Sequence, residues 1–160
     1  TFTMITSFRL FIVTFLYHIC LFAHCQIPCG IYSDAMQIMQ IQEDLSTIEK
    51  AMGMINSLSE KSDPQSFNQL NRWIVSKEEH AQNVQDIISE YFLTQRIKQS
   101  SKNYENTLIT LHQLLVSVMK CKQNVNKANV RKSNELLDNF LDLYFDEHGI
   151  NHLNKLKSDS

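Results

Sequence analysis

Glycine and proline are scarce in this sequence, with three and two residues respectively among 160. A many-turned all-β protein needs more of both, so their scarcity favours long helices. A large excess of one sign of charge is also missing, since the formal net charge is only −2. This balance excludes the basic surface field that holds nucleic acid or an anionic membrane. The length and the 43% hydrophobic and 20% charged residues are typical of a single globular domain.

The run from Leu10 to Ala23 carries no formally charged side chain, and Arg9 stands directly before it. A positive residue, a short apolar core and a small residue at its end are typical of a secretory leader. The run is shorter than the about 20 apolar residues that cross a bilayer comfortably. We therefore predict that residues 1–23 are a leader, cleaved after Ala23, which directs the mature protein out of the cell or into an organelle without membrane attachment. The other interpretation is a buried or anchoring helix that stays attached.

Apolar residues beyond the leader recur at alternating steps of three and four, the spacing of one helix face. The first such helix follows Asp34, which is placed to cap its first turn. The second runs from about Pro64 to Gln95, after Asp63 as cap. Lys77 interrupts the second inner face as a polar or edge position. The predicted inner faces are Ile38, Ile41, Leu45, Ile48, Met52 and Ile55, then Leu70, Trp73, Ile74, Ala81, Val84, Ile88 and Tyr91.

Two further helices are predicted, the first from about Ser101 to Lys122. Their inner faces are Tyr104, Leu108, Leu111, Leu115 and Val118, then Val130, Leu137, Phe140 and Tyr144. Gly149 is expected to end the last helix in a left-handed conformation, so that residues 151–160 form a polar tail. Four helices joined by short polar connections favour an all-α, antiparallel up-down four-helix bundle over residues 34–150.

The stretch between leader and bundle, residues 24–33, holds one of the two prolines and the closely spaced Cys25 and Cys29. Cleavage at the predicted point makes His24 the first residue. A free α-amine, an imidazole, the adjacent amide and two thiolates then lie within a few residues of one another.

These groups can bind one metal ion. The amine of His24 and the amide nitrogen of Cys25 can enter one five-membered chelate ring. A reversal at Pro28 and Gly30 brings Cys29 back to the same ion. The result is two nitrogens and two sulfurs in a plane, with the imidazole able to approach from above. Such a set suits Ni(II) or Cu(II), whereas zinc prefers a tetrahedron.

The pattern HCxxPCGxY in this stretch resembles the nickel hook of nickel superoxide dismutases. The segments NQLNRWIVSKEEHAQ, EYFLTQRIK and LVSVMKCKQ resemble the longer members of that family from marine microbes and eukaryotes. The resemblance implies that His24, Cys25 and Cys29 bind nickel, which alternates between Ni(II) and Ni(III) while superoxide becomes dioxygen and hydrogen peroxide. It also implies a four-helix bundle and a homohexamer.

The resemblance implies roles for residues around the metal as well. Tyr32 matches a tyrosine that positions anions near the open face of the nickel, although it could simply pack at the start of the first helix. Pro28 and Gly30 shape the hook, and would form a turn before a helix in any case. His80 is placed to hydrogen-bond toward the imidazole of His24 and fix its orientation. A lone histidine on a helix is also a common surface residue.

The partner of the His24 imidazole stays open, because the glutamate of the family is not clearly matched. Gln40 or Glu43 lies roughly where it would fall. Cys121, His112, His148 and His152 are interpreted as structural or surface residues. Met36, Met39, Met52, Met54 and Met119 are interpreted as core filler.

Two other functions fit parts of the sequence. A secreted helical-bundle interaction protein would join Cys25 and Cys29 in a disulfide, because secretion favours oxidation. A copper-binding relative would use the same donors, because copper outcompetes nickel for most such ligand sets. A metal-free protein with an intact disulfide would identify the first, and elemental analysis would identify the second.

Overall fold

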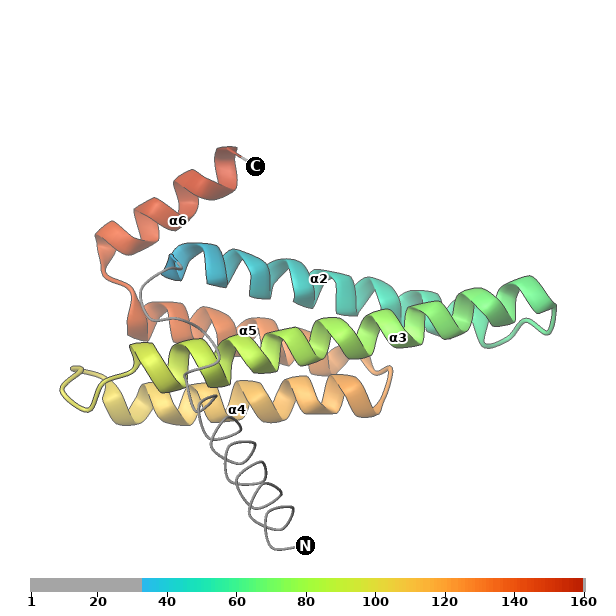
Figure 1. Cartoon of the computed structure of the whole chain (residues 1–160), viewed down its shortest axis with the longest axis horizontal. Coiled ribbons are helices and arrows are strands. Elements are labelled where there is room, and N and C mark those ends of the chain that lie inside the picture. Colours follow the sequence, from blue (N-terminus) through green and yellow to red (C-terminus); the bar gives the residue numbers. More distant parts are fainter. Residues whose placement is uncertain (1–32, 160) are drawn as a thin grey trace, which may run out of the picture.

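The computed structural model describes residues 33–159, and every regular element among them is a helix. The elements are α2 (Asp34–Leu58), α3 (Pro64–Asp86), η2 (Ile87–Arg96), α4 (Tyr104–Gln123), α5 (Lys127–Tyr144) and α6 (Glu147–Asp159). Each long helix packs on the next, and α5 returns to α2. Successive helices run in opposite directions (Figure 1). The predicted all-α class and the helical bundle are confirmed.

The inner face of α2 is the most regular part of the core. All six positions predicted from the sequence are buried, and five of them are completely inaccessible to solvent. Fully burying an aliphatic side chain of this size contributes about 1.5–3 kcal/mol relative to leaving it exposed. The periodicity of α2 therefore accounts for its place in the bundle.

The first half of α3 is less buried than the sequence predicts. Leu70 and Trp73 are only half-buried, and Ile74 is 38% exposed. Figure 1 shows the physical reason, because the hairpin of α2 and α3 extends beyond the ends of α4 and α5. Among residues 33–159, α2 is the helix that runs alongside this part of α3. The hairpin itself begins as expected, since the Asp63 carboxylate accepts a hydrogen bond from the Ser66 amide at 2.9 Å.

The last part of the predicted second helix is a π-helix, η2, which continues α3 without a break. Its backbone hydrogen bonds span five residues, as from the Ile97 amide to the Phe92 carbonyl at 2.9 Å. The side chains of Thr94 and Gln95 also donate to carbonyls five residues earlier, at 2.6 and 3.2 Å. Residues five apart lie far from one another around an α-helix, but nearly on one face of a π-helix. The wider turn therefore decides which side chains of η2 point toward α2.

Lys77 is buried, and not at an edge. Only 3% of the residue is exposed. Its ammonium group donates to the carbonyls of Cys121 and Lys122 at 2.8 and 2.6 Å, and pairs with Glu78 at 2.7 Å. The last carbonyls of a helix have no partner within the helix. Lys77 therefore caps the C-terminal end of α4 from the neighbouring helix.

The C-terminal region differs most from the prediction. Gly149 lies inside α6 without a left-handed backbone, so the predicted stop there is wrong. α5 ends instead at Tyr144, because Phe145 is extended. Residues 151–159, expected as a polar tail, belong to α6, and Leu153 is buried in the core. α6 packs across α2.

The inner faces of α4 and α5 follow the prediction in part. Leu111, Val118, Val130, Leu137 and Phe140 are buried as expected, whereas Tyr104, Leu108, Leu115 and Tyr144 are only half-buried. The interpretation of Cys121 as a buried thiol is confirmed, and His112, His148 and His152 are exposed as expected. Met52 is core filler, but Met36 and Met119 are exposed, contrary to the prediction. Between residues 33 and 159, no helix is long and apolar enough to cross a membrane.

Candidate metal centre

The residues predicted to form the metal hook lie outside the described part of the chain. This applies to the ligands His24, Cys25 and Cys29, and to Pro28, Gly30 and Tyr32. The description begins at Ser33, the residue before α2. Within residues 33–159 there is no group of three or more histidine, cysteine, aspartate or glutamate residues that could hold a metal ion.

Asp34 anchors the point where the predicted hook joins the bundle. It does not cap α2 as predicted, because the cap position is Ser33 and its side chain makes no capping hydrogen bond. The Asp34 carboxylate instead accepts hydrogen bonds from the hydroxyls of Tyr91 and Tyr144 at 2.5 and 2.8 Å. Arg96 completes the cluster with donors at 2.8 Å from both carboxylate oxygens.

The π-helix explains how this cluster forms. Tyr91 and Arg96 are five residues apart in η2, and both reach Asp34. In an α-helix these two side chains would point in different directions. Aromatic packing also joins η2 to α5, since Phe92 lies edge-on to Phe140 at 5.0 Å between ring centroids. The first turn of α2 is therefore tied to η2 and α5 together.

Burial and hydrogen bonds within the cluster shift the pKa values of Asp34 and Tyr144. Burial raises the pKa of Asp34, but the hydrogen bonds from Arg96, Tyr91 and Tyr144 outweigh it and hold that pKa below its usual value. Burial and the hydrogen bond to Asp34 raise the pKa of Tyr144 to about 12. Asp34 is thus an anion, and Tyr144 a neutral donor, across the physiological pH range.

His80 has a partner that the sequence analysis did not identify. Its Nδ1 lies 2.6 Å from a carboxylate oxygen of Asp44, on the neighbouring helix α2. Asn83 donates to the second oxygen at 2.6 Å, and Gln40 donates to the first at 3.2 Å. The Asp44 side chain is 1% exposed and that of His80 is 36% exposed. A buried carboxylate therefore stands behind a half-exposed imidazole.

A signal for Asp44 is present in the sequence. Asp44 lies three residues after Ile41 and four before Ile48, which places it on the inner face of α2. A charged residue at such a position needs partners from a neighbouring helix. Which helix provides them is a matter of packing, and the sequence pattern does not contain that information. Of the two residues left open as partners of His24, Gln40 joins this cluster, whereas Glu43 is exposed.

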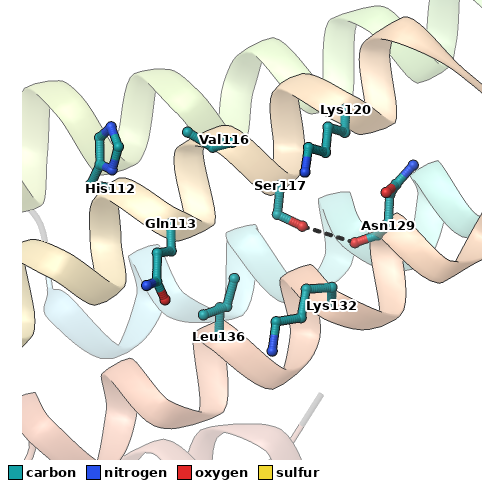
Figure 2. Close-up of a pocket in the computed structure, with 8 residues that line it drawn as sticks. All are labelled: His112, Gln113, Val116, Ser117, Lys120, Asn129, Lys132 and Leu136. Carbon is teal, nitrogen blue, oxygen red and sulfur yellow. Dashed lines mark hydrogen bonds between the residues drawn. The ribbon is translucent and has the colours of Figure 1, made fainter.

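A separate groove of about 500 Å³ lies between α4 and α5. Figure 2 shows Lys120 and Lys132 along it, with Ser117 donating to the Asn129 carbonyl at 3.0 Å. Exposed His112 lies at its other end. The groove is lined only from α4 and α5, so it does not include the Asp44 and His80 cluster between α2 and α3.

A family model for nickel-containing superoxide dismutases matches residues 21–148. The match covers most of the chain, including all of residues 24–33. No curated protein and no solved structure was found to match the chain. The matching family is one of metal-dependent oxidoreductases, and the all-helical fold is consistent with the match.

The chain belongs to the nickel-containing superoxide dismutase family. It is a nickel-dependent enzyme that converts two superoxide ions and two protons into dioxygen and hydrogen peroxide. This membership supports the dismutase over the interaction protein and the copper-binding relative. A disulfide between Cys25 and Cys29 would lie outside the described residues.

Proposed function

We propose that the nickel ion of this dismutase is held by the first residues of a processed chain. The donors are the α-amine and imidazole of His24, the amide nitrogen and thiolate of Cys25, and the thiolate of Cys29. The observation that carries the proposal is the family match over residues 21–148, which spans all three residues. The chemistry of the donor set also fits, because amine, amide and thiolate donors favour a planar Ni(II) ion.

Nickel held by these residues would supply the one-electron chemistry of the reaction, through its Ni(II) and Ni(III) states. The residues around it shape the site. Pro28 and Gly30 turn the hook so that Cys29 returns to the ion. Tyr32 would position the superoxide anion beside the nickel and keep larger molecules out.

His80 holds the imidazole of His24 in place by a hydrogen bond. A metal-bound histidine usually gives its other ring N–H to an acceptor nearby, which fixes its orientation. The position of His80 supports this role, since its imidazole is half-exposed beside α2, the helix that follows the hook.

The free α-amine of His24 arises when residues 1–23 are cleaved as a leader. The apolar run from Leu10 to Ala23 supports this step. The mature enzyme is accordingly secreted or delivered to an organelle. After cleavage, the mature enzyme has no membrane anchor in this proposal.

The ligand proposal is tested with two chains that differ by one residue. The first begins at His24, and the second carries one additional alanine before it, so that the amine becomes an amide. Both are loaded with nickel, and nickel content and superoxide consumption are measured. We expect the first chain to bind one nickel per chain and to be active, and the second to lose most of both. Equal nickel content and activity in the two chains would refute the ligand set.

The active form is a homohexamer in this proposal. The surface of the α2 and α3 hairpin supports self-association, because Phe67 is 64% and Val75 is 52% exposed there. Ile74 adds a third apolar side chain on α3, and we call these three residues the hairpin patch. Large apolar side chains gathered on one surface often mark a protein contact.

A further inference from the structure

Two exposed histidines lie one turn apart on α6. His148 and His152 are four residues apart in this helix, and both side chains are in contact with solvent. Residues four apart lie on the same side of an α-helix, with about 5–6 Å between their Cβ atoms. Within residues 33–159, neither imidazole has a hydrogen bond or an ion pair to another group. Both rings are therefore available to an external ligand.

The packing of α6 keeps this side of the helix in solvent. Leu153, the residue after His152, is 2% exposed and belongs to the core. Asp146 holds the first turn, because its carboxylate accepts from the Gly149 amide at 2.8 Å and its carbonyl accepts from the Ile150 amide at 3.0 Å. α6 also packs across α2. The helix therefore cannot turn to bury the two imidazoles without removing Leu153 from the core.

Two imidazoles in this arrangement are donors for a transition-metal ion. Imidazole nitrogen suits Ni, Cu and Zn, whereas Mg and Ca prefer oxygen donors. Histidines at positions i and i+4 on one helix face are also the arrangement by which HExxH helices hold zinc. Lys155, three residues after His152, lies on the same side of α6. Its flexible side chain can turn the ammonium group away from a bound ion.

We infer that His148 and His152 form a metal site separate from the proposed hook, which binds Ni(II) through both imidazoles while water fills the remaining coordination positions. The site needs no residue of the hook, so it goes beyond the proposed function and does not rest on it. The family match ends at residue 148, so His152 and most of α6 lie outside the matched part of the chain. The pair is therefore not part of what the family match describes.

The pair lies at the end of the bundle where the predicted hook joins. The Tyr144 hydroxyl donates to the Asp34 carboxylate at 2.8 Å, at the first turn of α2. His148 follows Tyr144 by four residues, which span at most about 14 Å between their Cα atoms. A nickel ion on α6 is therefore held at the same end of the molecule as the predicted hook.

The first test measures nickel binding by equilibrium dialysis at pH 7.5 in a chain without the proposed hook donors. This reference chain begins with one additional alanine before His24 and carries Cys25→Ser and Cys29→Ser. We expect it to bind one Ni(II) per chain. A reference chain that binds no nickel would overturn the inference. Because the hook donors are absent, this result does not depend on whether the proposed hook ligands are correct.

The second test introduces single substitutions into the reference chain. Two linked donors can bind about 10²–10⁴-fold more tightly than one. We therefore expect His148→Ala and His152→Ala each to weaken nickel binding by about 100-fold. His112→Ala removes an exposed histidine of α4 and serves as the matched control, with binding unchanged. Binding that survives both substitutions in α6, or that falls equally in His112→Ala, would overturn the inference.

Hydrogen exchange in α6 locates the bound ion without a substitution in that helix. An ion that joins two turns binds only the folded helix and so makes its opening rarer. At a nickel concentration 100 times the dissociation constant, we expect amide exchange in α6 of the reference chain to slow by up to about 100-fold, with α4 unchanged. Mg(II) at the same concentration should have no effect, because it prefers oxygen donors. Unchanged exchange with nickel, or equal slowing by both ions, would overturn the inference.

Discussion

Two charged side chains show how single residues connect the helices of this bundle. Lys77 bonds to the end of a neighbouring helix and Asp34 lies at the start of its own, and each is surrounded by partners from other helices. Leaving water costs a charged group several kcal/mol unless such partners replace the lost hydration. We therefore expect a substitution at either residue to weaken the packing between helices, and not only the helix that carries it.

Replacing Lys77 with methionine should destabilise the bundle. The change keeps most of the aliphatic chain but leaves the carbonyls of Cys121 and Lys122 without their donor. An unmet buried acceptor costs about 1–3 kcal/mol, so we expect a loss of that order in the free energy of unfolding measured with urea. Lys98→Met, at an exposed position, should change it by less than about 0.5 kcal/mol. Equal losses in both variants would contradict the capping role of Lys77.

The stability contributed by Asp34 should depend on pH. Its pKa in the folded protein lies below that of the unfolded chain, about 3.9. The unfolded chain therefore binds the proton first as pH falls, and the contribution is present above about pH 4 and disappears below it. Asp34→Asn should be less stable than wild type at pH 7, and the difference should vanish near pH 2 in denaturant unfolding. Asp138→Asn serves as the control and should show no such change. A constant difference at both pH values would rule out the ionised Asp34 as its cause.

At the scale of whole elements, η2 and α6 set the surroundings of the first turn of α2. The π-helix turns Tyr91 and Arg96 toward Asp34, and α6 packs across α2. π-helical turns are rare and often occur at functional sites. Here the wider turn lies beside the residue at which the predicted hook meets the bundle. We interpret η2 as the element that fixes the start of α2, where the predicted hook ends.

Gly149→Ala tests the packing at the start of α6. Alanine normally stabilises a helix interior by about 1 kcal/mol relative to glycine. A Cβ at Gly149, however, would lie 2.4 Å from Cδ1 of Phe145, so the ring must move. We expect Gly149→Ala to lower the free energy of unfolding, in contrast to the usual direction.

Gly53→Ala is the matched control for this change. A Cβ there would meet only the end of the Lys127 side chain at 3.2 Å, which can move away. This variant, in α2, should be as stable as the wild type or more stable. Stabilisation of similar size in both variants would show that Phe145 does not restrict Gly149.

At the scale of the whole molecule, the described helices form a bundle whose ends are uneven. Four long helices bury a continuous core, while the α2 and α3 hairpin projects beyond α4 and α5 (Figure 1). In the projecting part, Ile74 is exposed and Leu70 and Trp73 are only half-buried. A surface that is apolar and projects from the bundle in this way is suited to contact with another copy.

The proposed homohexamer can be tested at the hairpin patch. Replacing both Phe67 and Val75 with serine should lower the molar mass measured by light scattering to that of a smaller assembly, with the helical circular dichroism unchanged. Ile109→Ser removes an equally exposed apolar side chain from α4, outside the patch. It should leave the mass as in the wild type. A wild-type monomer, or a hexamer in the double variant, would refute this role of the patch.

The sequence alone was sufficient for features that depend on residues close together along the chain. Spacing of three and four predicts the buried face of α2, and Asp63 before Pro64 predicts where α3 begins. The donor set of His24, Cys25 and Cys29 can also be inferred locally, because its groups are neighbours along the chain. The family match confirms the nickel enzyme, and the assignment of these three ligands stays a prediction.

Only the tertiary structure decided the features that depend on a neighbouring helix. Asp44 behind His80, Lys77 at the end of α4, and Gly149 within α6 all result from packing between distant segments. The exposure of Ile74 has the same origin, because the α2 and α3 pair extends beyond α4 and α5. A periodic pattern shows which side of a helix is apolar. It does not show whether a partner covers that side, since the partner's length and position come from the fold.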